Sequence, residues 1–63
     1  MHIITKRGSI DNQITYEHYC DTITDMNDID KSTITLGSTC IVVNGTTGLE
    51  FYIADSQKQW HAV

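Results

Sequence analysis

The residues best suited to chemistry are two cysteines and three histidines in a chain of 63 residues. His18 and Cys20 stand two positions apart, and Cys40 and His61 could complete a four-ligand zinc set. Structural zinc sites are usually built from close ligand pairs such as Cys-x2-Cys. Only one close pair is present, so the pattern favours core cysteines and surface histidines. We therefore expect no cofactor and no metal.

The cysteines could instead pair with each other or act as nucleophiles. A disulfide persists in an oxidising compartment, and no apolar signal-peptide core follows Met1. We therefore expect Cys20 and Cys40 to be free thiols. A Cys–His dyad stays open on sequence alone, but a chain this short rarely provides both a core and a water-excluding pocket. We expect a protein that is not an enzyme.

The spacing of the aspartates disfavours a calcium site, and the residues around Ser38 disfavour a nucleophilic serine. Four aspartates gather in one short segment: Asp21, Asp25, Asp28 and Asp30. An EF-hand loop that began at Asp25 would require an oxygen ligand at Ile29 and a glycine at Asp30. Ser38 lies in Gly-Ser-Thr-Cys and not in a Gly-x-Ser-x-Gly elbow. We interpret the aspartates as a solvated helix face.

The balance of charge limits the partners. Four basic residues stand against eight acidic ones, which gives a net charge of −4 and a pI near 4.9. Nucleic-acid backbones and anionic membranes attract clustered Lys and Arg, so we expect neither as a partner. No apolar run approaches the roughly 20 residues that span a bilayer.

Composition indicates a mainly β protein. Ile, Val and Thr together make 21 of the 63 residues, and their β-branched side chains fit a pleated surface better than a helix. Proline is absent, so nothing interrupts long strand ladders. The length leaves room for one small domain, residues 1–63, with 1–13 as a possible strand or arm and 14–63 as its body.

The N-terminal part predicts two extended segments. Met1–Thr5 has the pattern of a short strand that Lys6-Arg7-Gly8 stops. Ser9–Gln13 is mostly polar and predicts a turn or an extended arm. Ile14–Cys20 alternates well enough for a strand, although both of its faces carry an aromatic residue. The pattern alone therefore does not choose the inward face of this strand.

The spacing of the apolar residues changes after this strand. Ile23, Met26 and Ile29 recur every three residues, and Thr22-Ile-Thr-Asp25 is typical of a capping box at a helix start. The sequence therefore predicts a short helix or helical turn near residues 22–29. The alternative is an acidic loop.

The second half of the chain predicts a β-meander. Thr39–Val43 is a continuous apolar strand, and Asn44–Gly48 has the glycines of a hairpin loop. Leu49–Ala54 alternates as a second strand, and Gln59–Val63 forms a third after a polar turn. The predicted fold is a small antiparallel β-meander of about four to five short strands with one short helix.

Alternation in the strand Leu49–Ala54 separates two faces. If Leu49, Phe51 and Ile53 face the core, Tyr52 lies on the opposite face. An apolar second face would mark an association surface, and Tyr and Trp are enriched at interface hot spots.

Three features of the second half carry a resemblance: Leu36-Gly-Ser-Thr-Cys-Ile-Val-Val43, the glycine turn at Gly45 and Gly48, and Tyr52-Ile-Ala-Asp-Ser56 followed by Trp60. This pattern resembles a module of small virion proteins from tailed phages and prophages. The segment Asp21-Thr-x-x-Asp-Met26 is similar to the short Asp-Thr-x-x-Asp-Leu lead-in of such modules. The likeness covers about residues 20–63, and its motifs are structural.

The resemblance implies a non-enzymatic structural component of a bacteriophage virion: a head decoration or fibre protein, or a neck or tail accessory. It would oligomerise and dock on the particle, with its own copies and other virion proteins as partners, after synthesis in the host cytoplasm. The expected interface residues are Ile3, Ile4, Tyr16, Tyr52 and Trp60. The alternative is a small acidic phage-encoded inhibitor of a host nucleic-acid enzyme, whose aspartates would mimic phosphates.

Overall fold

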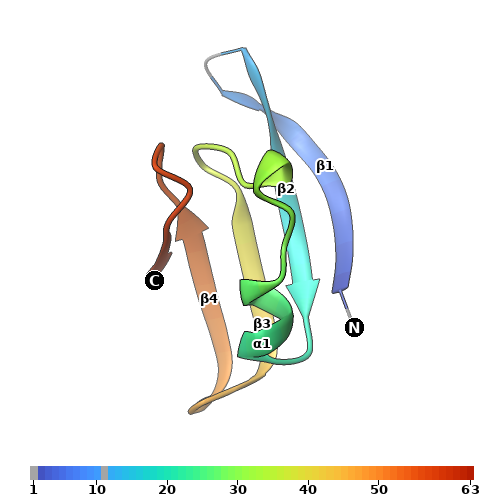
Figure 1. The fold of residues 1–63 in the computed structure, drawn as a ribbon, viewed down its shortest axis with the longest axis vertical. Helices are drawn as coiled ribbons and strands as arrows, with labels where there is room; N and C mark the ends of the chain where they lie inside the picture. The colour runs from blue at the N-terminus through green and yellow to red at the C-terminus, as the bar shows by residue number, and fades with distance from the viewer. Residues whose placement is uncertain (1, 11) are drawn as a thin grey trace.

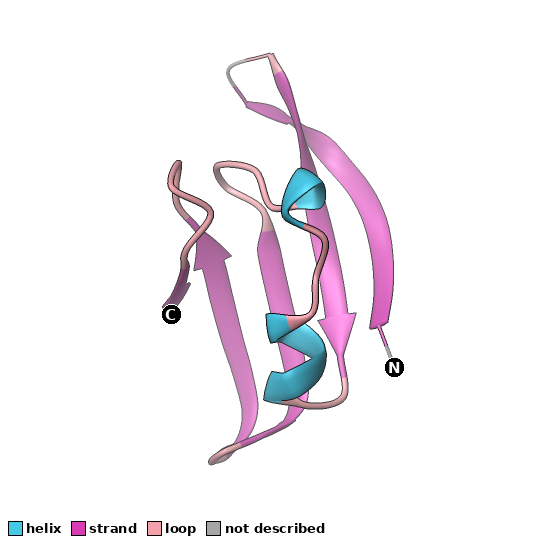
Figure 2. Ribbon diagram, viewed as in Figure 1, coloured by secondary structure: helices cyan, strands magenta, loops and turns pink. Residues whose placement is uncertain are grey.

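The computed structural model describes residues 2–10 and 12–63 and contains one five-stranded sheet with a short helix on one side (Figure 1, Figure 2). The strands, in their order across the sheet, are β1 (His2–Ile10), β2 (Gln13–Cys20), β3 (Thr39–Gly45), β4 (Gly48–Ala54) and β5 (Trp60–Ala62). The helix α1 (Ile23–Asn27) and the 3-10 turn η1 (Lys31–Thr33) follow β2. The predicted mainly β fold with a short helix near residues 22–29 is confirmed.

The sheet is mixed. Neighbouring strands are antiparallel in the pairs β1–β2, β3–β4 and β4–β5, whereas β2 and β3 run parallel. A tight turn cannot join parallel neighbours, so the chain needs a crossover connection. Here α1 and η1 form that crossover. The expected antiparallel meander is observed over β3–β5, and the β2–β3 pair differs from it because the crossover returns the chain to the starting end of β2.

β1 is longer than predicted. Lys6-Arg7-Gly8 does not end the strand: the register shifts there in a β-bulge, and pairing with β2 continues to Ile10. A bulge adds a residue to one strand while the ladder goes on. The predicted polar turn at Ser9–Gln13 is therefore shorter and contains Asn12, whose φ is 66°. Two residues of the predicted segments, Met1 and Asp11, lie outside the described ones.

The hairpin between β3 and β4 is tighter than predicted. Asn44 and Gly45 belong to β3, so the turn is reduced to Thr46 and Thr47. Gly48 begins β4 with a φ of 100°, a conformation that residues with a side chain rarely adopt. The backbone therefore requires the glycine at position 48, which was predicted to lie in the loop.

The core lies between the sheet and the crossover. Its buried apolar side chains are Cys20, Met26, Ile29, Ile34, Cys40, Val42 and Ala54. Ile23, Tyr52 and Trp60 are partly buried and pack against them. The sheet contributes small residues at Cys20, Cys40 and Ala54, so the longer side chains of the crossover have room to fill the space above them at the density that protein interiors require.

The predicted capping box begins α1. Thr22 Oγ1 accepts the Asp25 N–H at 3.3 Å, and Asp25 Oδ2 accepts the Thr22 N–H at 3.4 Å. These bonds occupy N–H groups that the first turn of a helix leaves without partners. Neither α1 nor any other helical segment in the described part of the chain is long and apolar enough to cross a membrane.

The Thr22→Ala substitution tests the capping box. It removes the hydroxyl that accepts the Asp25 N–H, and we expect the free energy of unfolding to fall by about 1 kcal/mol. Urea denaturation followed by circular dichroism measures this loss. Thr24→Ala, at an exposed position of the same helix, is the matched control and should change stability by less than about 0.5 kcal/mol. Equal losses in the two variants would contradict a role for the cap.

Candidate functional site

No described element covers one face of the sheet, since α1 and η1 lie on the other side (Figure 1). The register aligns its side chains in rows across the strands: Ile3 pairs with Tyr19, Tyr19 with Ile41, and Ile41 with Phe51. Paired residues project to the same side of a sheet. We call this surface the open face, and its apolar residues are Ile3, Tyr19, Ile41, Val43, Leu49, Phe51 and Ile53.

The open face is apolar and accessible to solvent. The exposed fractions are 52% for Ile3, 50% for Val43, 58% for Leu49, 49% for Phe51 and 42% for Ile53. Ile3, Tyr19 and Val43 also border a shallow hollow of about 140 Å³. Single exposed apolar residues are ordinary on a protein surface, but a contiguous patch marks an interaction site. The arrangement can therefore bind another apolar surface.

The structure decides the orientation of β4, which the alternation left conditional. Leu49, Phe51 and Ile53 point outward. Tyr52, which was predicted as an interface residue, packs against the core. The cause lies in β3, where buried Cys40 pairs with Tyr52 and half-buried Ile41 pairs with Phe51. Because β3 is apolar on both sides, its own sequence does not show which side the crossover covers.

The five predicted interface residues divide between the two faces: Ile3 lies on the open face, and Ile4, Tyr16, Tyr52 and Trp60 lie on the helix-bearing face. Ile4 is placed there by its pairing with His18. Tyr52 and Trp60 contribute to the packing of the core. Sequence reasoning missed Tyr19 and Ile41, and the signal that could have found them is the apolar run on both sides of β3.

A buried histidine joins four segments on the helix-bearing side. The His18 side chain on β2 is fully buried. Its Nε2 lies 2.8 Å from the Thr33 carbonyl oxygen of η1, and its Nδ1 lies 2.7 Å from His2 Nε2 on β1. The His2 ring stacks on it at 4.9 Å, and the Trp60 ring of β5 meets it nearly at a right angle at 5.9 Å.

The partners of His18 define its protonation. A carbonyl oxygen only accepts, so His18 Nε2 carries the proton and Nδ1 is left as an acceptor. His2 Nε2 therefore donates to it. Burial lowers the pKa of His18 below its ordinary value of 6.5 and outweighs the Thr33 hydrogen bond, which raises it, while the nearby His2 lowers it further. The geometry thus favours a neutral imidazole with a structural role.

The possible zinc ligands do not come together. Cys20 and Cys40 are buried free thiols with their sulfur atoms 3.7 Å apart. His61 pairs with Ile53, which places it on the open face, and its Nε2 lies 2.6 Å from Asp55 Oδ2. Among residues 2–10 and 12–63, no group of three His, Cys, Asp or Glu side chains is placed to hold a metal ion. The predicted core placement of the cysteines is confirmed, whereas His18, which was expected at the surface, is buried.

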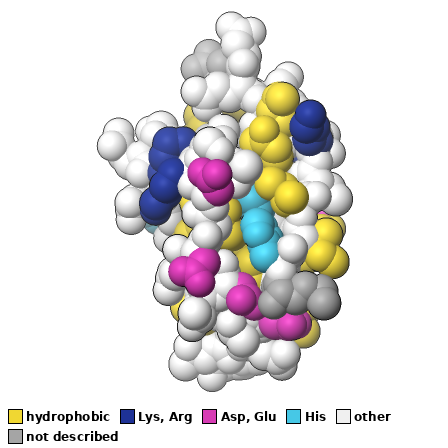
Figure 3. Space-filling model, turned by 45° about the vertical axis from the view of Figure 1, so that its right-hand side comes forward, with side chains coloured by type: hydrophobic (Ala, Val, Ile, Leu, Met, Phe, Trp, Pro, Cys, Tyr) yellow, Lys and Arg dark blue, Asp and Glu magenta, His cyan; other side chains and the backbone are white. Residues whose placement is uncertain are grey.

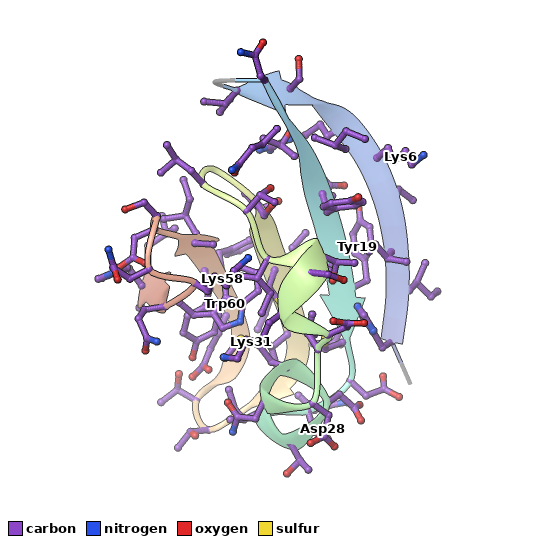
Figure 4. All side chains as sticks on the ribbon, turned by 45° about the horizontal axis from the view of Figure 1, so that its top comes forward. Lys6, Tyr19, Asp28, Lys31, Lys58 and Trp60 are labelled. Carbon is purple, nitrogen blue, oxygen red and sulfur yellow. The ribbon has the colours of Figure 1, made fainter. Side chains whose placement is uncertain are left out.

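Lys31, Lys58 and Trp60 lie close together (Figure 4) and border a cavity of about 240 Å³ on the helix-bearing side. Lys58 has a φ of 62°, which is uncommon for a residue with a side chain. Its Nζ donates to the carbonyl oxygens of Lys31 at 2.8 Å and Ile34 at 3.0 Å. Lys58 thus satisfies one carbonyl group of η1 and one of the residue that follows it, and we assign this cluster to the fold.

Comparison with protein-family models, with curated proteins and with solved structures finds no match for this chain.

Acid is expected to weaken the fold through His18. Burial lowers the folded-state pKa, so the unfolded chain binds this proton more readily, and stability falls as the pH drops below the ordinary value of 6.5. The free energy of unfolding should fall by at most about 1.4 kcal/mol per pH unit, the value for one proton. Urea denaturation between about pH 7 and pH 5 measures this slope.

The His18→Gln variant is the control for this slope. Its amide keeps a donor for the Thr33 carbonyl, so we expect a less stable protein at neutral pH with a clearly smaller slope in the same range. An unsubstituted chain whose stability does not change between about pH 7 and pH 5 would contradict the assignment.

Both thiols are expected to resist modification in the folded chain. Burial raises the pKa of Cys20 and raises that of Cys40 to about 12, and the thiolate is the reactive form of cysteine. At neutral pH, Ellman's reagent should therefore react with both thiols only after a denaturant is added. Rapid reaction of either thiol in the native chain would contradict the buried placement.

Proposed function

We propose that this chain is a non-enzymatic structural protein that works by docking its open face onto another protein surface. The setting that we propose is a bacteriophage virion, in which the chain serves as a head decoration or fibre protein, or as a neck or tail accessory. It would be made in the host cytoplasm. The resemblance of residues 20–63 to small virion proteins supports the setting, and the open face supports the mode of action.

The row from Ile3 to Phe51 is the observation that carries this proposal. Four neighbouring strands present Ile3, Tyr19, Ile41 and Phe51 side by side on the uncovered side of the sheet. Removing apolar surface from water is favourable by roughly 25 cal/mol per Å², and the loss of freedom on association offsets part of this gain. A contiguous patch therefore favours a bound state more strongly than the same residues scattered over the surface would.

Docking would also stabilise the chain itself. A domain of about 60 residues buries only about 60% of the surface that its unfolded chain exposes. Among the residues that the structure describes, the buried apolar cluster comprises seven side chains, two of them cysteines and one an alanine. A partner that binds only the folded chain shifts the folding equilibrium toward it. One assembly would thus both stabilise the small core and bury the uncovered apolar face.

The Phe51→Asp substitution tests the mode of action. It places a charge on the open face that docking would have to bury without a partner, so binding should weaken roughly ten-fold or more. Phe51 is half-exposed, and the variant should keep the circular dichroism spectrum of the unsubstituted chain. The measurement is the amount of tagged chain in gradient-purified particles of the phage that encodes it, quantified by immunoblot.

The matched control is Asp28→Asn, an exposed position on the helix-bearing side, which should leave incorporation unchanged. Equal incorporation of Phe51→Asp and the unsubstituted chain would refute docking through the open face. Particles that lack the unsubstituted chain would refute the virion setting.

The aspartates of the crossover favour a second candidate function. Acidic side chains are visible on the helix-bearing side (Figure 3), and Asp28 and Asp30 of the crossover are exposed. An acidic inhibitor of a host nucleic-acid enzyme would bind through this side. The two functions predict opposite results, because an inhibitor would be weakened by Asp28→Asn and would tolerate Phe51→Asp.

A further inference from the structure

We propose that the open face packs against the open face of a second copy of this chain, in a two-fold symmetric sandwich of two sheets. This inference rests on the proposed function and names the partner of the same face. Sheets that pack face to face bury the alternate side chains of both inner faces. The outward residues of β3 and β4 would then complete a second core between the two copies.

Pairing through sheet edges is the other route to self-association, and β1 is poorly suited to it. The strand is exposed along its length, but the bulge between Lys6 and Gly8 interrupts the ladder. Lys6 projects outward from this edge (Figure 4), so two β1 strands paired about their middle would bring cations together. At the opposite edge, β5 has three residues. The open face is the larger and less obstructed surface.

The size of the face suits a stable dimer. Figure 1 looks along the shortest dimension of the molecule and shows the sheet from its broad side. The two longer dimensions of the molecule are 33 and 19 Å, and a rectangle of this size has an area of about 600 Å². In a stable interface, each partner buries roughly 800 Å² of accessible surface. Side-chain relief makes the accessible area larger than its projection. These dimensions set an upper limit on the projection of one open face, and that limit is of the same order as the area that one partner needs.

Few charges lie on the open face. The row from Ile3 to Phe51 contains no charged residue, and the row from Thr5 to Ile53 contains one carboxylate, that of Glu17, which accepts a hydrogen bond from the Tyr19 hydroxyl. At the margins, Asp21 borders the hollow beside Ile3, and His61 Nε2 lies 2.6 Å from Asp55 Oδ2. Two copies can therefore bring the uncharged middle rows together with little like-charge repulsion.

Symmetry singles out Ile41. In a two-fold contact the same patch is used on both copies, and the residue at the centre of the patch meets its own counterpart. β3 is the middle strand of five, and Ile41 stands between Tyr19 on β2 and Phe51 on β4. Ile41 should therefore lie opposite Ile41 of the second copy. This holds for every two-fold axis that runs parallel to the two sheets and passes through the centre of the patch.

Cross-linking at this position tests the geometry. The Ile41→Cys variant, treated with a short bis-maleimide at neutral pH, should give a covalent dimer on a denaturing gel. The unsubstituted chain is the blank, because Cys20 and Cys40 are buried. Asp28→Cys, with an exposed thiol on the helix-bearing side, is the matched control and should give none. Circular dichroism checks that both variants keep the fold.

Sedimentation equilibrium over a concentration series gives an independent measurement. We expect a monomer–dimer equilibrium that approaches twice 7.1 kDa, and Phe51→Asp should weaken dimerisation roughly ten-fold or more. A strict monomer, an odd-numbered oligomer, or a dimer that cross-links through Asp28→Cys and not through Ile41→Cys would overturn the inference.

The two proposals can fail separately. A strict monomer whose incorporation into particles still depends on Phe51 overturns self-pairing and leaves the proposed function standing, with another virion protein on the open face. A monomer whose incorporation does not depend on Phe51 overturns both.

Discussion

The crossover between β2 and β3 is the constraint on which the rest of the structure depends. Because these strands are parallel, the chain must return over one face of the sheet before β3 can begin. That return places Met26, Ile29 and Ile34 above the sheet and makes the side beneath them the core. Neither α1 nor η1 covers the opposite side. A five-stranded sheet with a single crossover thus has one closed face and one open face.

Polar groups fasten the crossover to the sheet. His18 connects β2 to Thr33 of η1, and Ser38 Oγ accepts the backbone N–H of Tyr16 at 3.1 Å and that of Thr35 at 3.2 Å. His18 and Ser38 are both fully buried, and a buried polar group without a hydrogen bond would cost free energy. Their hydrogen bonds therefore stabilise the crossover and also fix its position over the sheet. Apolar contacts alone would fix that position less selectively.

The crossover also decides which side of the molecule carries charged residues and which side is apolar. Four aspartates belong to the crossover and its flanks, and acidic side chains are visible on the closed side together with Lys and Arg (Figure 3). The strands supply the other side, where Ile41 and Phe51 lie in one row. A chain too small to cover both faces of its sheet can complete its apolar packing in an assembly. This physical need connects the architecture to the proposed structural role.

Local chemistry was sufficient to predict most elements from the residues alone. β-Branched composition indicated the strands, the pair Thr22 and Asp25 indicated the start of α1, and the glycine at position 48 indicated the hairpin, because each depends on neighbours within a few residues. The parallel pairing of β2 with β3 and the outward side of β4 depended on the tertiary structure. β3 is apolar on both sides, and strand alternation repeats every two residues whichever side is buried. Only the path of the crossover, a contact between distant parts of the chain, selects the buried side.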